Sequence, residues 1–384
     1  MAERAPDSAQ QRDPYSGERV VWRGRPQVVE LPPLMRIAAL VSFGIGFVSL
    51  CFAVVIAKSL GIAPTPSFVF AFWSASLGIA FWKGPKLWLE GVEYVVTEQR
   101  VLWRRGPFSR SLGRDSVSFV RIFWCANAPG AGDLEFVRAV PTGALRRRLR
   151  LRLSGVSAPA RVAAIVLGRE HVTPAASEGR PLTQRLEAGE RVLWAARPRK
   201  TARTYLPRGR DGWLKTALFA LLVVAFVRLL AGGIPAVERL IDAGMPVRSL
   251  SFVALVAGLS VTGLIVVLTA AYAAFDSVVR PSRLEEQTRY LVTNRRVLIQ
   301  RGREELYLDR ARIVDVIDAP AGAGISDVFL VLDGPRARAL AASGAFGERE
   351  RGPSLVPVLE RVEDADGVRQ VLSEQSEPNL PRAA

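Results

Sequence analysis

Two long runs of apolar residues stand out in the first quarter of the chain. Residues 37–57 are 21 consecutive positions without a charge, bounded by Arg36 and Lys58, and residues 61–82 form a second uncharged run. About 20 apolar residues in a helix cross a hydrocarbon layer roughly 30 Å thick. The pattern therefore predicts a transmembrane helix hairpin over residues 34–85.

A second pair of apolar runs predicts another transmembrane hairpin over residues 213–275. Residues 250–275 are 26 uncharged positions, whereas Arg228 interrupts the run at 213–234. An Arg at a bilayer centre costs on the order of 2.5–3.5 kcal/mol on insertion scales. Because Arg228 lies nearer the far end of its helix, we expect its side chain to snorkel to the interface. A pore would need a second intramembrane charge, and the other predicted spans offer none.

Outside these runs, apolar and polar residues alternate in two stretches that repeat each other at an offset of 196. Residues 94–106 and 290–302 each break at a polar turn and then resume, which is typical of a β-hairpin. The identical pairs include Tyr94 and Tyr290, Thr97 and Thr293, and Arg100 and Arg296. We interpret these six residues as a structural motif that shapes and braces the hairpin.

A second repeat extends the duplication towards the N-terminus. Residues 17–26 and 189–198 share the order Gly-Glu-Arg-Val, a hydrophobic residue, Trp, two further positions and Arg-Pro, at an offset of 172. The chain thus reads as two similar halves. The predicted organisation is a disordered leader at 1–16, a first strand at 17–33, a hairpin at 34–85, a β module at 86–180, a first strand and linker at 186–212, a hairpin at 213–275, a β module at 283–375 and a disordered tail at 376–384.

Each repeated hairpin is followed by a further strand, a Gly-rich turn and another apolar strand. A phosphate-binding loop would precede a helix N-terminus, so the turns at 128–133 and 319–324 are interpreted as structural. The second half closes with a predicted helix over 364–374. The first half shows no equally clear closing helix, and 173–185 is a poor candidate.

One strand of the first half carries a run of arginines. The alternation at 145–153 places Arg148, Arg150 and Arg152 on one face and leucines on the other. A solvated basic face is one interpretation of this pattern. Contact with anionic lipid headgroups is the other, because each charge near a cytoplasmic leaflet adds roughly 1 kcal/mol of attraction, which salt weakens.

Composition and charge support a membrane protein and predict its orientation. Hydrophobic residues make up 49% of the chain, yet the formal net charge is +16. Twenty Lys and Arg residues flank the predicted helices on the side of the β modules, against three in the two helix-hairpin loops. Because cytoplasmic flanks carry the excess of positive charge, we expect both termini and both β modules in the cytoplasm of a bacterium, with four helices in its plasma (inner) membrane.

The residues that carry chemistry are sparse. His171 is the one histidine, which argues against a His-based metal site or a His-dependent catalytic triad. Cys51 and Cys125 are expected to be packed thiols, because free Cys is among the most buried residue types. The sequence therefore predicts no cofactor and no enzymatic activity. Membrane topology accounts for the basic residues better than a nucleic-acid site does.

These motifs resemble the bacterial PH-like domain proteins of the membrane-bound type. The likeness rests on the repeated Gly-Glu-Arg-Val and Arg-Pro segments, a helix hairpin, Tyr-x-Val-Thr-x-x-Arg-Val-Leu, and the turns at Gly132-Asp133 and Ser326-Asp327. It covers most of residues 17–375 in two tandem copies. The resemblance implies two small β-barrels or sandwiches, each capped by a C-terminal helix, that bind lipids, peptides or proteins.

The expected fold is thus a membrane α + β protein with two helix hairpins and two PH-like modules. The leading functional interpretation is a non-enzymatic membrane protein that presents these modules to lipid headgroups or to an unknown protein partner. A four-helix component of a transport or channel complex is the alternative. An enzyme is the least supported class, because no nucleophile, ligand cluster or cofactor loop accompanies acidic residues such as Asp309, Asp315 and Asp318.

Overall fold

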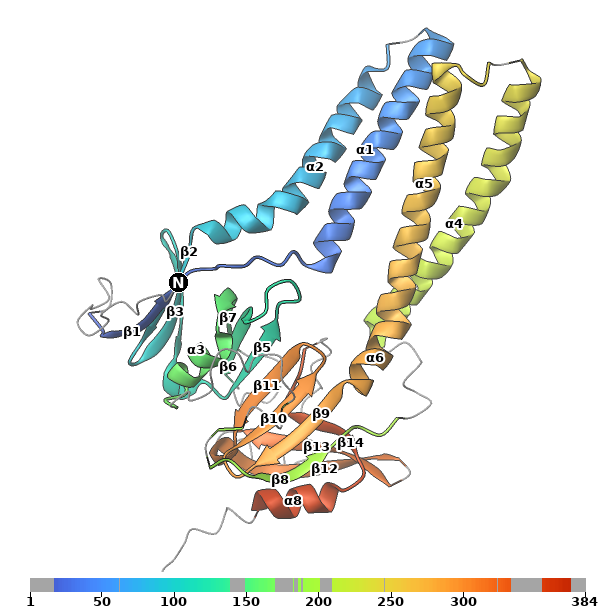
Figure 1. Ribbon diagram of the computed structural model, residues 1–384. Coiled ribbons are helices and arrows are strands. Elements are labelled where there is room, and N and C mark those ends of the chain that lie inside the picture. Colours follow the sequence, from blue (N-terminus) through green and yellow to red (C-terminus); the bar gives the residue numbers. More distant parts are fainter. Residues whose placement is uncertain are drawn as a thin grey trace, which may run out of the picture. The chain divides into compact units, whose positions relative to one another are not determined.

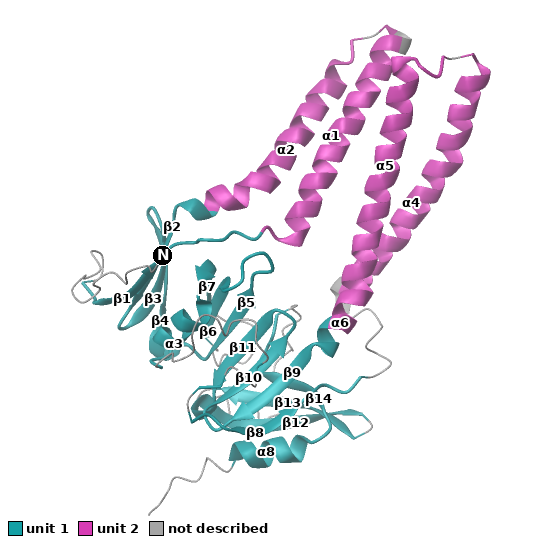
Figure 2. Ribbon diagram, in the orientation of Figure 1, with its two compact units in different colours: residues 1–30, 89–201, 284–384 teal, residues 31–88, 202–283 magenta. Residues whose placement is uncertain are grey.

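A computed structural model resolves the chain into two compact units, coloured separately in Figure 2. Unit 1 comprises residues 1–30, 89–201 and 284–384, and unit 2 comprises residues 31–88 and 202–283. Each unit therefore draws on both halves of the sequence. The structure describes residues 17–61, 63–138, 149–169, 182, 186–187, 189–200, 209–244, 246–322, 324–332 and 354–373.

Unit 2 is built from long helices (Figure 1). They are α1 (Pro33–Leu60), α2 (Thr65–Glu90), α4 (Gly209–Asp242) and α5 (Leu250–Ala274), which continues through a π-helical turn, η6 (Phe275–Val279), into α6 (Arg280–Glu286). Proline opens α1, and Gly61 ends it in the left-handed conformation, as is common at these positions. The side chain of Ser249 caps α5 by accepting a hydrogen bond from the Phe252 N–H at 3.2 Å.

Within unit 2, α5 packs against both α1 and α4. The Ser49 hydroxyl on α1 donates to the Ser67 carbonyl on α2 at 2.9 Å, and Gly258 on α5 leaves room for Cys51 on α1. Large apolar side chains remain exposed, including Phe72 on α2 and Leu221 on α4. Four helices of the described chain are long and apolar enough to cross a membrane, as the apolar runs predict.

In unit 1, the first half of the chain forms the copy 1 module, defined as β1 to β7 with α3. One antiparallel sheet has the order β1 (Val20–Gly24), β2 (Val92–Thr97), β3 (Arg100–Arg105) and β4 (Phe108–Gly113). A 3-10 turn, η2 (Arg114–Ser116), leads to β5 (Phe119–Trp124), β6 (Ala131–Arg138), β7 (Leu149–Ser157) and helix α3 (Pro159–Val166).

The second half repeats this order as the copy 2 module, defined as β8 to β14 with α8. Its elements are β8 (Val192–Ala196), β9 (Thr288–Thr293), β10 (Arg296–Arg301), β11 (Glu304–Asp309), η7 (Arg310–Arg312), β12 (Ile313–Gly322), β13 (Ile325–Leu332), β14 (Val358–Val362) and helix α8 (Ala365–Ser373). Strands β12, β13 and β14 form a three-stranded antiparallel sheet. Every described β element and the closing helix of copy 1 therefore has a counterpart in copy 2.

Each module is built around a hydrophobic core. In copy 1, apolar residues of β2 and β3 pack with those of β5 to β7 and with α3, around the buried Phe136 and Leu134. In copy 2, β9 to β11 pack in the same way with β13, β14 and α8, around Leu306 and Leu359. The α3 helix was not expected from the sequence, which offered only 173–185 as a poor candidate. Its signal is weak because it has eight residues and no side chain caps its N-terminus.

The two modules share one sheet, which the sequence did not predict. A seven-stranded antiparallel sheet runs β7-β6-β5-β11-β10-β9-β8, so that β5 of copy 1 pairs with β11 of copy 2 (Figure 1). In this pairing, Val120 lies opposite Tyr307 and Phe123 lies opposite Glu304. We call the β5–β11 contact the seam. It joins the two copies within unit 1.

Candidate functional site

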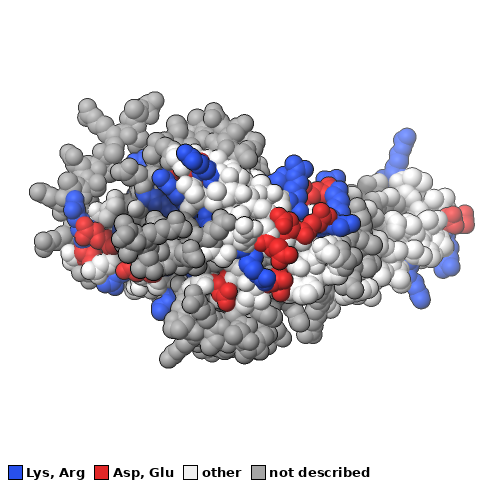
Figure 3. All heavy atoms as spheres, turned by 90° about the horizontal axis from the view of Figure 1, so that it is seen from below, with Lys and Arg blue, Asp and Glu red and all other residues white. Residues whose placement is uncertain are grey.

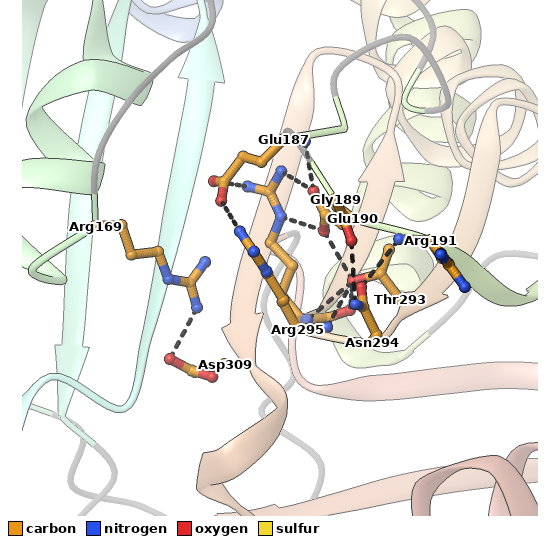
Figure 4. Close-up of polar contacts among 10 residues, drawn as sticks. Arg169, Glu187, Gly189, Glu190, Arg191, Thr293, Asn294, Arg295 and Asp309 are labelled. Atoms are coloured by element: carbon orange, nitrogen blue, oxygen red, sulfur yellow. Dashed lines mark hydrogen bonds and ion pairs between the residues drawn. The ribbon is translucent and has the colours of Figure 1, made fainter.

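The repeated Thr and Arg residues form a polar cluster with a glutamate from the segment before β8. In copy 2, the Thr293 hydroxyl donates to Glu190 Oε1 at 2.8 Å, and two nitrogens of Arg296 donate to the two oxygens of Glu190, each at 2.8 Å. Glu187 adds a second carboxylate 3.4 Å from Arg296 (Figure 4). The cluster ties the start of β8 to the β9–β10 hairpin.

Burial and charge act against each other in this cluster. The side chain of Glu190 is 0% exposed and that of Arg296 is 9% exposed. Burial alone raises the pKa of Glu190, but the hydrogen bonds and charge of Arg296 outweigh it, so that this pKa lies below its usual value. Burial likewise lowers the pKa of Arg296, and Glu190 more than offsets it. Both groups are therefore charged at neutral pH.

Copy 1 repeats the cluster in a more exposed form. The Thr97 hydroxyl donates to Glu18 Oε2 at 2.5 Å, and Arg100 Nε donates to Glu18 Oε1 at 2.7 Å. The Arg100 side chain is 41% exposed. The motif residues Thr97, Arg100, Thr293 and Arg296 thus lie where the hairpin interpretation places them. Sequence reasoning missed the two glutamates, although Glu18 and Glu190 are themselves identical residues of the Gly-Glu-Arg repeat.

The two tyrosines of the motif link β2 and β9 to the bulged strands β7 and β14. The Tyr94 hydroxyl donates to the Ser154 carbonyl at 2.9 Å and accepts from the Ser154 N–H at 2.8 Å. Tyr290 does the same with Glu360, at 3.3 and 3.0 Å. Burial raises the pKa of both phenols, so they remain protonated at neutral pH. These hydroxyls satisfy backbone groups inside the fold.

A further repeated residue, Arg114 in copy 1 and Arg310 in copy 2, anchors each closing helix. Arg114 Nε donates to the Val166 carbonyl at the end of α3, at 3.0 Å. Arg310 in copy 2 donates to the Val371 carbonyl of α8 and lies 3.4 Å from the Thr293 carbonyl. The last carbonyls of a helix have no partner within it, and a cation there also interacts favourably with the negative end of the helix dipole. This explains why the same Arg occurs in both copies.

The predicted basic face on β7 is partly neutralised by its neighbour β6. Arg152 forms an ion pair with Asp133 at 2.5 Å, and its guanidinium lies 5.4 Å from the Phe123 ring centre. Arg150 lies 3.9 Å from Glu135. Arg148 lies outside the described residues. The structure thus brings two of the three predicted arginines together on one strand, beside two carboxylates.

The seam contains a buried charged cluster that has no repeat. The Arg121 side chain on β5 is 0% exposed and forms an ion pair with Glu135 at 2.8 Å. It also donates to the Leu355 carbonyl of copy 2 at 2.8 Å. Glu304 on β11 accepts from the Leu355 N–H at 2.6 Å, so groups from both copies hold the same residue. Burial lowers the pKa of Arg121, and Glu135 opposes this shift.

Further contacts cross the seam. Phe119 and Val137 of copy 1 are buried in the hydrophobic core of copy 2. The backbone N–H of Trp124 donates to the Arg303 carbonyl at 3.0 Å. Arg169 and Asp309 form an ion pair at 2.8 Å (Figure 4). Apolar burial, backbone pairing and ion pairs therefore act together in joining the two modules.

Among the described residues of unit 2, a charged cluster surrounds Asp276. Asp276, in the π-helical turn after α5, forms ion pairs with Lys215 on α4 and, at 2.6 Å, with Arg280. Its side chain is 8% exposed. Arg228 is exposed on α4. The three apolar runs outside α4 lack a charged residue, as expected from the sequence. The helix that begins as α5 continues through η6, however, and carries Asp276 one residue beyond the predicted end of its span at 275.

The described acidic and Cys side chains, the Cys125 thiol included, show little reactive chemistry at neutral pH. No group of His, Cys, Asp and Glu side chains among them is arranged to hold a metal ion. Burial raises the pKa of the Cys125 thiol to about 11, so it is protonated at neutral pH. Comparison of the chain with protein-family models, curated proteins and solved structures finds no significant match.

Proposed function

We propose that this chain is a non-enzymatic integral protein of the bacterial plasma membrane, in which two PH-like modules form one cytoplasmic platform that binds lipid headgroups or a protein. The repeated topology supports the proposal most directly. Each module has four strands, then three strands and a closing helix, and each follows the same repeated motif. The polar residues that the copies share make contacts within the modules and so act in bracing them.

The proposed topology combines the helices with the charge distribution of the sequence. Two helix hairpins return the chain to the side from which it entered, so both β modules lie on one side. The twenty basic residues that flank the helices on that side favour the cytoplasm. Figure 3 shows acidic and basic side chains beside one another on one face, so the described part of this face is not uniformly basic. The proposed platform therefore includes protein binding as well as lipid binding.

Photocrosslinking of the full chain in cells tests this function. A photoreactive amino acid at Arg152 or Phe108 is expected to yield adducts that mass spectrometry identifies as a lipid or as a protein other than this chain itself. Val21 on β1, at another sheet edge, is the matched control position. Absence of adducts above this control, from both positions and under several growth conditions, contradicts a binding platform.

A component of a transport complex is the second candidate, and the Asp276 cluster is the observation that favours it. A buried carboxylate within helices of this kind is a recurrent feature of ion and proton pathways, and π-helical turns recur at functional sites. If unit 2 conducts ions or protons, Asp276→Asn abolishes flux into proteoliposomes. The exposed Arg228 serves as the comparison, as Arg228→Leu is expected to leave that flux unchanged.

A further inference from the structure

The seam joins two strands that are not counterparts of each other in the two copies. The counterpart of each seam strand lies at the end of a sheet. At the offset of 196, β4 of copy 1 corresponds to β11, and β12 of copy 2 corresponds to β5. Among the described strands, β4 ends the four-stranded sheet and β12 ends the three-stranded sheet. A contact between unlike surfaces is heterologous, and it can repeat from one molecule to the next until it closes a ring or forms an open chain.

We propose that copies of this chain associate head to tail, with β12 of one molecule adding antiparallel to β4 of the next. The new pairing repeats the seam between molecules. Its occupant is a second copy of this chain because the seam already shows that β5-type and β4-type edges of this sequence fit each other. The proposal rests on the strand pairing in unit 1 and requires neither a lipid nor another protein.

The registers of the strands support the equivalence residue by residue. Strand β4 pairs with β3 in the same register as β11 pairs with β10. Phe108 lies opposite Arg105, and its counterpart Glu304 lies opposite Arg301. Outward backbone groups alternate along a strand, so the same register places them at equivalent positions. Strand β4 can therefore offer the backbone pattern that β11 offers to β5.

Strand β12 matches β5 in the same way. Val316 faces Leu330 on β13, as Val120 faces Phe136 on β6. One hydrogen bond of the seam cannot recur, because Pro320 replaces Trp124 and has no N–H. The proposed contact is consequently weaker than the seam, which suits a reversible association between molecules.

Charge on these two end strands is complementary. Strand β4 carries the exposed Arg110, whereas β12 carries the exposed Asp315. In the seam register, Arg110 would face Ile317 with Asp315 two positions along on the same face. Diagonal neighbours across antiparallel strands are within reach of long side chains. The edges thus favour each other over pairing with a copy of themselves.

The helices of unit 2 show the same unlike pairing. α1, the first helix of its pair, packs against α5, the second helix of the other pair. Repeating that contact between molecules would bring α4 against α2 of the next chain, and these two helices lie at the ends of the row in Figure 2. Both keep large apolar side chains exposed, such as Leu221 and Phe72. Membrane anchoring would confine the assembly to the plane of the bilayer.

Disulfide crosslinking between differently tagged chains tests the proposal. Cys51 and Cys125 are first replaced by Ser in both. One chain then carries Phe108→Cys and the other Ala319→Cys, the counterparts of the opposed seam residues Glu304 and Phe123. Co-expressed in membranes and oxidised, they are expected to give several-fold more linked dimer than Val21→Cys with Ala319→Cys. Val21 lies on β1, at the other edge of the sheet.

Two further readouts separate head-to-tail pairing from other contacts. Arg110→Glu in the first chain is expected to lower the yield of the dimer, and Asp315→Arg in the second is expected to restore it. A yield no higher than that of the Val21 control overturns the proposal. Equal or stronger linkage between two Phe108→Cys chains also overturns it, because that result indicates a symmetric contact.

Discussion

Arg121→Met is expected to lower the free energy of opening of the β11 amides by about 3–5 kcal/mol, because removal of one member of a buried ion pair leaves the other uncompensated. Glu135 is that partner, at 2.8 Å, and the Leu355 carbonyl loses its donor as well. Hydrogen exchange of the full-length protein in detergent measures the change, since it reports the stability of individual segments.

Arg150 supplies a matched control for this substitution. It approaches the same carboxylate, Glu135, at 3.9 Å, but its side chain is 35% exposed. Exposed ion pairs contribute about 0–1 kcal/mol, so Arg150→Met is expected to change the β11 amides by no more than that. The double variant Arg121→Met with Glu135→Met should recover much of the loss, because the unpaired carboxylate is gone. Equal effects of Arg121→Met and Arg150→Met would show that the buried pair does not stabilise the seam.

Glu190→Gln is expected to destabilise the β9–β10 hairpin by roughly 3 kcal/mol, because it removes the charge that compensates the buried Arg296. Glu187 remains 3.4 Å from Arg296 and limits the loss. The same change in copy 1, Glu18→Gln, should cost about 1 kcal/mol, since Arg100 is 41% exposed and regains water. Hydrogen exchange of the two hairpins compares them within one fold, and a larger effect in copy 1 would contradict this account.

The effect of Glu190→Gln depends on pH in a defined direction. The pKa of Glu190 is lowered in the folded protein, so its contribution to stability is fully present above the unfolded value, about 4.3 for Glu. The contribution is lost as pH falls from there through the folded pKa. The difference in stability between wild type and Glu190→Gln is therefore expected to be constant near neutral pH and to narrow below about pH 4.

Local patterns in the sequence predict the local parts of this fold. Four helices follow from runs of uncharged residues, because the length of such a run alone indicates a membrane-spanning segment. The hairpins at Tyr94 and Tyr290 follow from alternation and from the duplication. Thr97 and Arg100 could be interpreted as structural because they occur at a turn in both copies. Their acceptor Glu18 lies 79 residues before Thr97, and spacing alone does not connect them.

The seam could not be predicted because nothing local specifies it. It pairs β5 with β11, which are separated by about half of the chain, and its central residue Arg121 corresponds to Ile317 in the other copy. A duplicated sequence also suggests two separate modules, whereas the structure merges them in one sheet. In the sequence, nothing distinguishes the buried Arg121 from the many other arginines of the chain. Its role becomes visible only with Glu135 and Leu355 in place.

A disulfide across the seam within one molecule tests the joining of the two copies most directly. Phe123 and Glu304 lie opposite each other on β5 and β11. In a chain without Cys51 and Cys125, Phe123→Cys with Glu304→Cys is expected to form an intramolecular disulfide as readily as Gln300→Cys with Glu305→Cys, an opposed pair within copy 2. Formation of the second disulfide without the first would show that the two modules do not share a sheet.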